Sequence, residues 1–189
     1  MRHKGVGKET TRSKVIDAAS RQFRKFGYSG VGIDALAKGA DVTSGAIYGH
    51  FGSKAGVFNA VLMSGLDEVI TSLPLLQAQH GDGWIDEFVD YYLGAAHRGD
   101  MEHVCAMASL TPEVIHFGGE MQAVYEEKMH QVAKIIAKGI KGDSEANVGK
   151  AWVILSLLTG GVNIARAMQT EPLAEQIATA VKGSIKALV

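Results

Sequence analysis

The sequence has little that would cross-link the chain or interrupt a helix. Cys105 is the single cysteine among 189 residues, so an internal disulfide framework is excluded. There are three prolines, and long stretches are rich in Ala, Leu, Lys and Glu, which favour helices. The sequence shows neither an alternating strand pattern nor an Asn-Gly hairpin signal. These features predict an all-α fold.

The sequence also lacks a long uninterrupted hydrophobic run. Residues 1–14 are polar and basic, unlike the apolar core of a signal peptide. The most apolar stretch, 151–165, contains Gly160, Gly161 and Asn163 and is shorter than the roughly 20 residues that cross a membrane. We therefore expect a cytoplasmic protein with no membrane partner.

The net charge of −1 conceals a strong asymmetry between two parts of the chain. Residues 1–54 hold ten Lys or Arg and four Asp or Glu, which gives +6. Residues 55–189 hold nine and sixteen, which gives −7, and the two parts sum to −1. A basic head on an acidic body indicates that the head meets a polyanion. The alternative is a solvated charged tail, since several of the bases precede Ser13.

Apolar spacing predicts a series of short helices in the first third of the chain. After a mobile arm over residues 1–10, a helix from Thr11 is expected to stop at Gly27. A second helix ends near Gly39, and a third follows the turn at residues 40–42, with Thr43 or Ser44 as its N-cap. A longer helix, capped by Ser53, is expected to end near Pro74.

Two short helices joined by a tight turn at Asp41 predict a helix-turn-helix. The second helix of this motif enters the DNA major groove, about 12 Å wide, and presents its N-terminal side chains to base edges. Small residues here would allow close approach, polar aromatics would reach phosphates or bases, and a lysine at the next helix start would meet a phosphate. Each of them also has a purely structural alternative, as a cap, a half-buried aromatic or a surface residue. The predicted DNA-binding residues are Thr43, Ser44, Gly45, Ala46, Tyr48, His50 and Lys54.

The segment resembles the TetR family of repressors. The resemblance rests on Phe26-Gly27-Tyr28, followed by Val42-Thr43-Ser44-Gly45-Ala46-Ile47-Tyr48-Gly49-His50-Phe51-Gly52-Ser53-Lys54. It covers about residues 11–62. The resemblance implies operator binding as a dimer, a small-effector pocket in the body, and a four-helix dimer interface made by the last two helices. Residues 10–70 would form the DNA-binding domain and 71–189 the effector-binding and dimerisation domain. Gly49 departs from the family pattern, which often has a larger polar residue there.

The body is predicted to contain five further helices. They cover about residues 84–96, 103–110, 120–138 and 146–168, and then a helix opened by Pro172 runs to the C-terminus. Aromatic and Met-rich walls suit an apolar or aromatic effector, although each such residue could simply be core. The candidate pocket residues are Met63, Phe88, Tyr91, Tyr92, Cys105, Met107, Phe117, Met121 and Tyr125.

The last two predicted helices carry the dimer prediction. The first is apolar nearly all round, and the second has an apolar stripe, as expected of helices buried on several sides. Packing against a symmetry mate would give a closed two-fold interface, with burial inside a monomer as the alternative. The predicted interface residues are Trp152, Leu155, Leu158, Val162, Ile177 and Val181.

The sequence offers little for catalysis, and neither a catalytic residue nor a cofactor is predicted. His97, Asp100, Glu102 and His103 could suggest a metal site, but a solvated polar corner is the favoured interpretation. Cys105 is expected to be a small buried hydrophobe, with redox sensing as the alternative. The leading hypothesis is a repressor released from a pseudo-palindromic operator by a small effector. A helical enzyme and an architectural DNA-binding protein are the other two.

Overall fold

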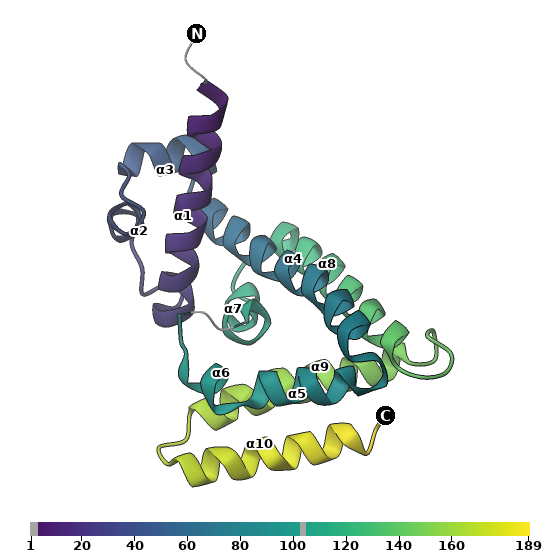
Figure 1. The fold of residues 1–189 in the computed structure, drawn as a ribbon. Helices are drawn as coiled ribbons and strands as arrows, with labels where there is room; N and C mark the ends of the chain where they lie inside the picture. The colour runs from purple at the N-terminus through teal and green to yellow at the C-terminus, as the bar shows by residue number, and fades with distance from the viewer. Residues whose placement is uncertain (1–3, 103–104) are drawn as a thin grey trace.

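The computed structural model describes residues 4–102 and 105–189, and within these ranges the chain is helical and has no strand. The predicted all-α fold is confirmed. Figure 1 shows α1 to α3 grouped as a head at one end, from which α4 runs into the body. The elements are α1 (Lys4–Phe26), α2 (Ile33–Gly39), α3 (Ser44–Phe51), α4 (Lys54–His80), the 3-10 turn η1 (Gly81–Gly83), α5 (Trp84–Leu93), α6 (Ala95–Gly99), α7 (Ala106–Val114), α8 (Gly119–Gly139), α9 (Val148–Arg166) and α10 (Glu171–Lys186).

Two helices are longer than the sequence pattern predicted. α1 begins at Lys4, so the predicted arm is wrong for residues 4–10, while residues 1–3 lie outside the described part. Once a helix is nucleated, each added residue gains a hydrogen bond at little further cost. α4 passes through the exposed Pro74 and ends at His80, where Gly81 has φ +53°. Proline removes one backbone donor, and the turns on either side keep the helix continuous.

One predicted helix is divided, and another is displaced. The segment predicted over 84–96 is split where Gly94 adopts an extended backbone between α5 and α6. The segment predicted at 103–110 is α7, which begins at Ala106 and contains Pro112; His103 lies outside the described residues. The predicted division at residue 70 falls inside α4, so the head and the body share one continuous helix.

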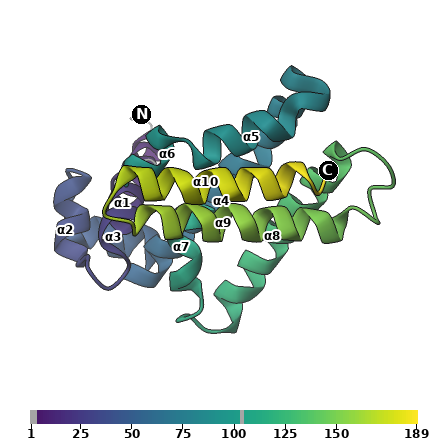
Figure 2. The same ribbon diagram turned by 90° about the horizontal axis from the view of Figure 1, so that it is seen from below.

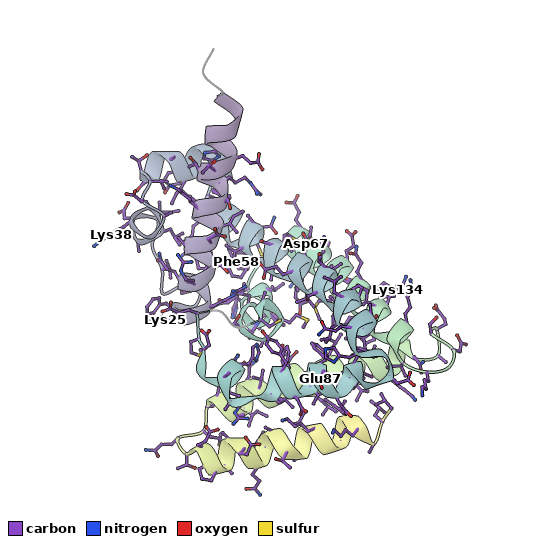
Figure 3. The ribbon with its side chains drawn as sticks, in the orientation of Figure 1. Lys25, Lys38, Phe58, Asp67, Glu87 and Lys134 are labelled. Carbon is purple, nitrogen blue, oxygen red and sulfur yellow. The ribbon has the colours of Figure 1, made fainter. Side chains whose placement is uncertain are left out.

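An aromatic cluster joins the head to the body. Phe58 of α4 lies with its ring centroid 5.4 Å from Phe23 of α1 and 4.9 Å from Phe117, which follows α7. Tyr28, in the turn after α1, lies 4.8 Å from Phe117. Figure 3 shows Phe58 where α1 meets α4. Such ring pairs add to the stabilisation from apolar burial, so the cluster holds the two parts in one arrangement.

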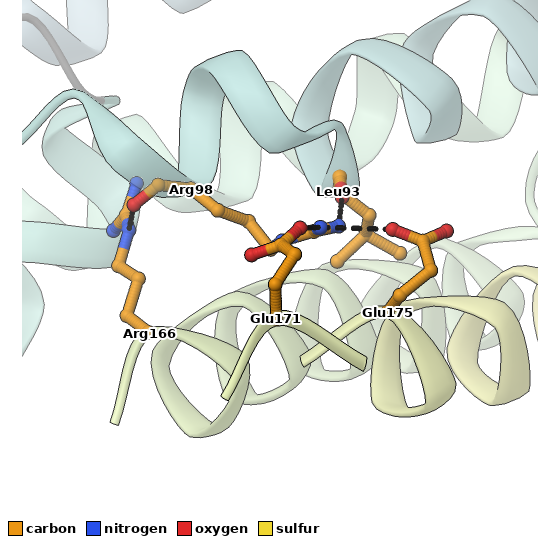
Figure 4. Close-up of polar contacts among 5 residues, drawn as sticks. All are labelled: Leu93, Arg98, Arg166, Glu171 and Glu175. Atoms are coloured by element: carbon orange, nitrogen blue, oxygen red, sulfur yellow. Dashed lines mark hydrogen bonds and ion pairs between the residues drawn. The ribbon is translucent and has the colours of Figure 1, made fainter. Parts of the chain in front are cut away.

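At the other end of the molecule, α9 and α10 lie side by side across the face seen in Figure 2. Arg98 of α6 is buried and fixes the start of α10. Its guanidinium donates to the Leu93 carbonyl and to the carboxylates of Glu171 and Glu175, as Figure 4 shows. Arg166 of α9 donates in turn to the backbone carbonyls of His97, at 2.8 Å, and Arg98, at 3.3 Å. The two arginines thereby tie α6 to α9 and α10.

α9 is long and apolar enough to cross a membrane by length and composition alone. In the folded chain, however, it packs against α10, α8, α5 and α7. Ala151, Ile154 and Leu158 are fully or almost fully buried in those contacts. Packing against several other helices explains this composition, because such a helix must be apolar on more than one side.

We expect Arg98→Met to lower the free energy of unfolding by about 1–3 kcal/mol, because buried charge-assisted hydrogen bonds are lost. Lys186→Met is the matched control: Lys186 pairs with Asp86 through side chains that are 51% and 55% exposed. Exposed ion pairs contribute little, so this control should change stability by about 0.5 kcal/mol or less. Urea denaturation of both variants measures the difference, and equal stability losses would contradict the role given to Arg98.

Candidate nucleic-acid interface and effector cavity

The head contains a helix-turn-helix built by α2, a tight turn and α3. Asp41 adopts φ +54° in this turn, and the Val42 N–H donates to the Ala37 carbonyl at 3.0 Å. Aspartate tolerates this left-handed conformation better than most residues. Leu36 and Ile47 are fully buried beneath the two helices. The predicted turn at residues 40–42 is therefore present, and it fixes the angle at which α3 leaves α2.

Local hydrogen bonds define the start of α3. The Thr43 side chain caps the helix by accepting from the Ala46 N–H at 3.2 Å. The Ser44 hydroxyl donates instead to the Asp34 carboxylate of α2 at 2.7 Å. Of the two predicted caps, Thr43 takes this role, and Ser44 braces the two helices against each other. Both side chains lie at the edge that a helix-turn-helix turns toward DNA.

The outer face of α3 has small residues and one large exposed side chain. Tyr48 is 53% exposed, whereas Gly45 and Gly49 are exposed and have almost nothing near the position of a Cβ. Ala46 and His50 are half-buried beside them. Another molecule could therefore come close to the backbone of α3 on this face, around the hydroxyl of Tyr48. A helix that enters the DNA major groove needs such a surface. The contacts of these residues with DNA stay predictions.

Lys54 begins α4 beside the recognition helix. Its Nζ lies 4.1 Å from the centroid of the Tyr28 ring, a cation-π contact that orients the ammonium group. The Ser53 hydroxyl accepts from the Gly56 N–H at 3.0 Å, so the predicted cap is present. The guanidinium carbon Cζ of Arg12, on α1, lies 5.6 Å from the centroid of the Phe51 ring at the end of α3. Sequence reasoning did not single out Arg12, because nothing in its local pattern brings it to α3.

A cavity of about 480 Å³ lies between α4, α5 and α7. Five of the predicted pocket residues line it, and they are Phe88, Tyr91, Tyr92, Cys105 and Met107. The structure places the other four elsewhere: Phe117 is in the aromatic cluster, the Tyr125 hydroxyl is 2.8 Å from that of Thr111, and Met63 and Met121 pack against the core. Arg24, Gly65 and Leu73 also line the cavity and were not among the predicted pocket residues. They reach it because α1 and α4 pack against each other beside it.

The inner wall of the cavity combines aromatic and polar groups. The Tyr92 hydroxyl is buried close to the side chains of Thr159 and Cys105. Burial raises the pKa of the Tyr92 hydroxyl well above its usual value and also raises the pKa of the Cys105 thiol. Both groups are therefore neutral near pH 7, and a protonated thiol is a poor nucleophile. The part of the wall that Tyr92 and Cys105 form is therefore uncharged.

His97 supports the cavity wall. The predicted solvated polar corner is wrong for this residue, because its side chain is buried. It is 6% exposed; its Nδ1 donates to the Tyr92 carbonyl at 2.7 Å, and its Nε2 accepts from the Cys105 N–H at 3.2 Å. Burial lowers the pKa of the imidazole, so its neutral form is favoured. Both ring nitrogens are thus engaged. Within the described residues, no group of three potential metal ligands occurs, and His103 lies outside them.

A second contact connects the body to the head beside the aromatic cluster. Glu113 of α7 accepts from the Tyr28 N–H at 3.0 Å through Oε1. Gly27 has φ +71°, and a Cβ on it would lie 2.7 Å from the same oxygen. The predicted stop at Gly27 therefore has two causes, the left-handed backbone and the close carboxylate.

The predicted dimer residues divide between core and surface. Leu155, Leu158 and Val162 are buried inside the chain, so the structure removes them from any surface that a second copy could contact. Ile177 and Val181 are half-buried, and Val181 packs over Gly161. Trp152 is exposed, together with three further apolar residues of the same two helices, Val153, Ile164 and Leu173. Helix periodicity identifies apolar positions, but the packing of α9 on its neighbours decides which of them stay outside.

The fold and the head define an all-helical protein with a helix-turn-helix DNA-binding domain. The family model described as "Bacterial regulatory proteins, tetR family" matches residues 15–61. Residues 15–61 therefore form a DNA-binding domain of the tetR family type.

Relatives and solved structures agree with this family. The chain is 33% identical over 89 residues to the HTH-type transcriptional repressor SCO4008 of Streptomyces coelicolor, a match that covers 47% of this chain and 45% of that protein. It is 46% identical over 56 residues to the regulator SrpR of Pseudomonas putida, a match that covers 30% of this chain and 26% of that protein. The chain thus spans less than half the length of these two relatives.

Whole-chain similarity appears at the level of structure. A TetR transcriptional regulator from Legionella pneumophila superimposes with a TM-score of 0.75 at 18% identity, over 91% of this chain and 95% of that chain. The reduced form of NemR from E. coli superimposes with a TM-score of 0.72 at 19% identity, over 92% of this chain and 95% of that chain. At these identities the likeness establishes a shared fold.

Two glycine substitutions in the head should change stability in opposite directions. Gly27→Ala places a Cβ at positive φ and against Glu113, so we expect a loss of about 1–2 kcal/mol. Gly49→Ala adds a methyl group in open space within α3 and should gain about 0.5–1 kcal/mol from helix propensity. Urea denaturation of the DNA-free protein measures both, and changes of the same sign would contradict the geometry described for these positions.

Proposed function

We propose that this protein is a homodimeric transcriptional repressor of the cytoplasm, which leaves a pseudo-palindromic operator when a small apolar or aromatic effector binds the body. The observation that carries the proposal is the path of α4. This helix begins with Lys54 beside the recognition helix, and its residues Gly65, Val69 and Leu73 line the cavity. One rigid element thus connects the candidate DNA-binding face with the candidate effector site.

The head supplies what DNA binding needs. Residues 1–54 carry a charge of +6, which favours approach to the phosphate backbone. The exposed side of α3 presents Tyr48 between two glycines, with Thr43 at its N-terminal edge. Base edges would be read by the start of α3, while Lys54, Arg12 and Tyr48 lie where phosphates flank a recognition helix.

A two-fold dimer would present two such heads to one operator. Four apolar side chains on α9 and α10 are exposed, namely Trp152, Val153, Ile164 and Leu173, and the two helices share the face seen in Figure 2. The exposed Gly160 lies between them on α9 and would allow close approach of a second copy. A self-complementary patch of this kind closes into a dimer, whose two recognition helices would read half-sites about 34–36 Å apart, or a multiple of that spacing.

Effector binding would act through the contacts between body and head. A molecule in the cavity touches α4, α5 and α7, and α7 also holds the Tyr28 turn through Glu113. Because the core is closely packed, a shift of α4 or α7 must move the head rather than be absorbed. The coupling is reciprocal, so operator DNA should weaken effector binding by the factor by which the effector weakens DNA binding.

Selection of bound duplexes from a random pool, followed by footprinting, tests the operator proposal. We expect a site with two-fold symmetry, and Tyr48→Ala should weaken binding to it by about tenfold, the loss of one charge-assisted contact. Val189→Ala is the control, because Val189 is 50% exposed at the C-terminus, which lies far from the head in Figure 1. It should bind like the wild type. Recovery of no symmetric site, or equal affinities of the two variants, would overturn the proposal.

Sedimentation analysis tests the dimer. Ile164→Glu places a charge on the exposed apolar face of α9, so we expect it to shift the protein from dimer to monomer. Ile115→Glu is the control, because Ile115 is 69% exposed beyond the end of α7. This variant should keep the wild-type mass. A monomeric wild type, or a dimer that Ile164→Glu leaves intact, would exclude α9 from the interface.

A further inference from the structure

Among the described residues that line the cavity, Arg24 is the one cation, and it comes from the head. Arg24 lies in the last turn of α1 and lines the cavity opposite α5. Its Nε is buried and has no hydrogen-bond partner among the described residues. The adjacent Lys25, by contrast, pairs with Glu102 at 2.7 Å outside the cavity. A guanidinium with a buried and unpaired donor is costly, and that cost is recovered when an acceptor arrives.

The surrounding chain makes room for this guanidinium. A Cβ on Gly65 of α4 would lie 3.3 Å from Arg24 Nη2 and 2.5 Å from the Ala106 Cβ of α7. The absence of a side chain at this position lets α1, α4 and α7 converge on the cavity, with the Arg24 side chain between them. The guanidinium therefore sits at the junction of the three helices that connect the head with the body.

The other polar groups of the wall show how a ligand would be oriented. Phe88, Met107 and Leu73 provide apolar surface. Glu68 and Glu87 also line the cavity, but both are exposed and can remain hydrated at its rim; Figure 3 labels Glu87 on α5. An acidic group would thus be repelled at the rim and held at Arg24. A planar guanidinium recognises a carboxylate through two parallel hydrogen bonds.

We propose that the effector is an amphipathic organic anion, with an aromatic or aliphatic body in the cavity and a carboxylate or similar acidic group bound by Arg24. This inference rests on the proposed effector site and adds its ligand class. It also adds a direct route to the head, because the anion would bind a side chain of α1 itself. α1 packs against α2, α4 and α7, so a state of α1 that pairs better with the anion is selected, and the helix-turn-helix moves with it.

Calorimetric titration of the full-length protein with three matched probes tests the ligand class. The probes are naphthoate, neutral naphthamide and cationic naphthylmethylammonium, which share one aromatic body. We expect naphthoate to bind most tightly and Arg24→Gln to weaken it about 10- to 100-fold, with a much smaller effect on naphthamide. Arg21→Gln is the matched control, since Arg21 is exposed on the same helix and does not line this cavity. It should bind naphthoate like the wild type.

Several results would overturn the inference. These are no binding of naphthoate, equal binding of the three probes, a preference for the cation, or unchanged naphthoate affinity in Arg24→Gln. If Arg24→Gln fails to fold, as judged by thermal unfolding, the charge-preserving Arg24→Lys decides instead: it should keep the preference for naphthoate but with reduced affinity, because an ammonium cannot form the paired hydrogen bonds. Operator selection and footprinting are separate measurements, so the repressor proposal can survive the loss of the anionic ligand class.

Discussion

The packing of Phe58 against Phe23 and Phe117 is the contact on which the arrangement of the whole chain depends. Phe58 belongs to α4, Phe23 to α1, and Phe117 follows α7, so three segments of the head and body meet at one buried ring. Tyr28 completes the cluster, and Lys54 and Glu113 both contact this residue. The same few side chains therefore set the position of the helix-turn-helix relative to the body. A displacement of the body helices at this cluster is therefore transmitted to the head, and the reverse also holds.

Polar groups in the body have two different roles. His97, Arg98 and Arg166 form hydrogen bonds with backbone groups or carboxylates, although Arg98 Nε is buried without a partner among the described residues, and they tie α6 to α9, α10 and the segment that leads into α7. Arg24 Nε is likewise buried without a partner among the described residues, and Arg24 lines the cavity. Satisfied groups rigidify a structure, whereas unsatisfied ones carry a cost that a ligand can remove. This contrast distinguishes a structural scaffold from a receptive site within one small body.

Sequence patterns predicted the head more accurately than the body. In the head, function and fold depend on short-range signals: Gly27 ends a helix, Asp41 makes the turn, and Thr43 and Ser53 cap helices. In the body, the apolar pattern did not show that α4 continues through Pro74 or that Gly94 divides a helix. It also assigned Leu158 to an interface, although the packing of α9 buries this residue within the chain. Periodicity reports that a residue is apolar, and the neighbouring helices decide what covers it.

The sequence by itself determined the all-helical fold, the helix-turn-helix and the charge asymmetry between head and body, because each of these follows from residues that are close together along the chain. Tertiary structure decided the cavity. Arg24, Gly65 and Cys105 come from three distant segments, and only the crossing of α1, α4 and α7 brings them to one wall. No local pattern marks Arg24 as different from Arg21 on the same helix. The distinction arises because one guanidinium points into the interior and the other into water.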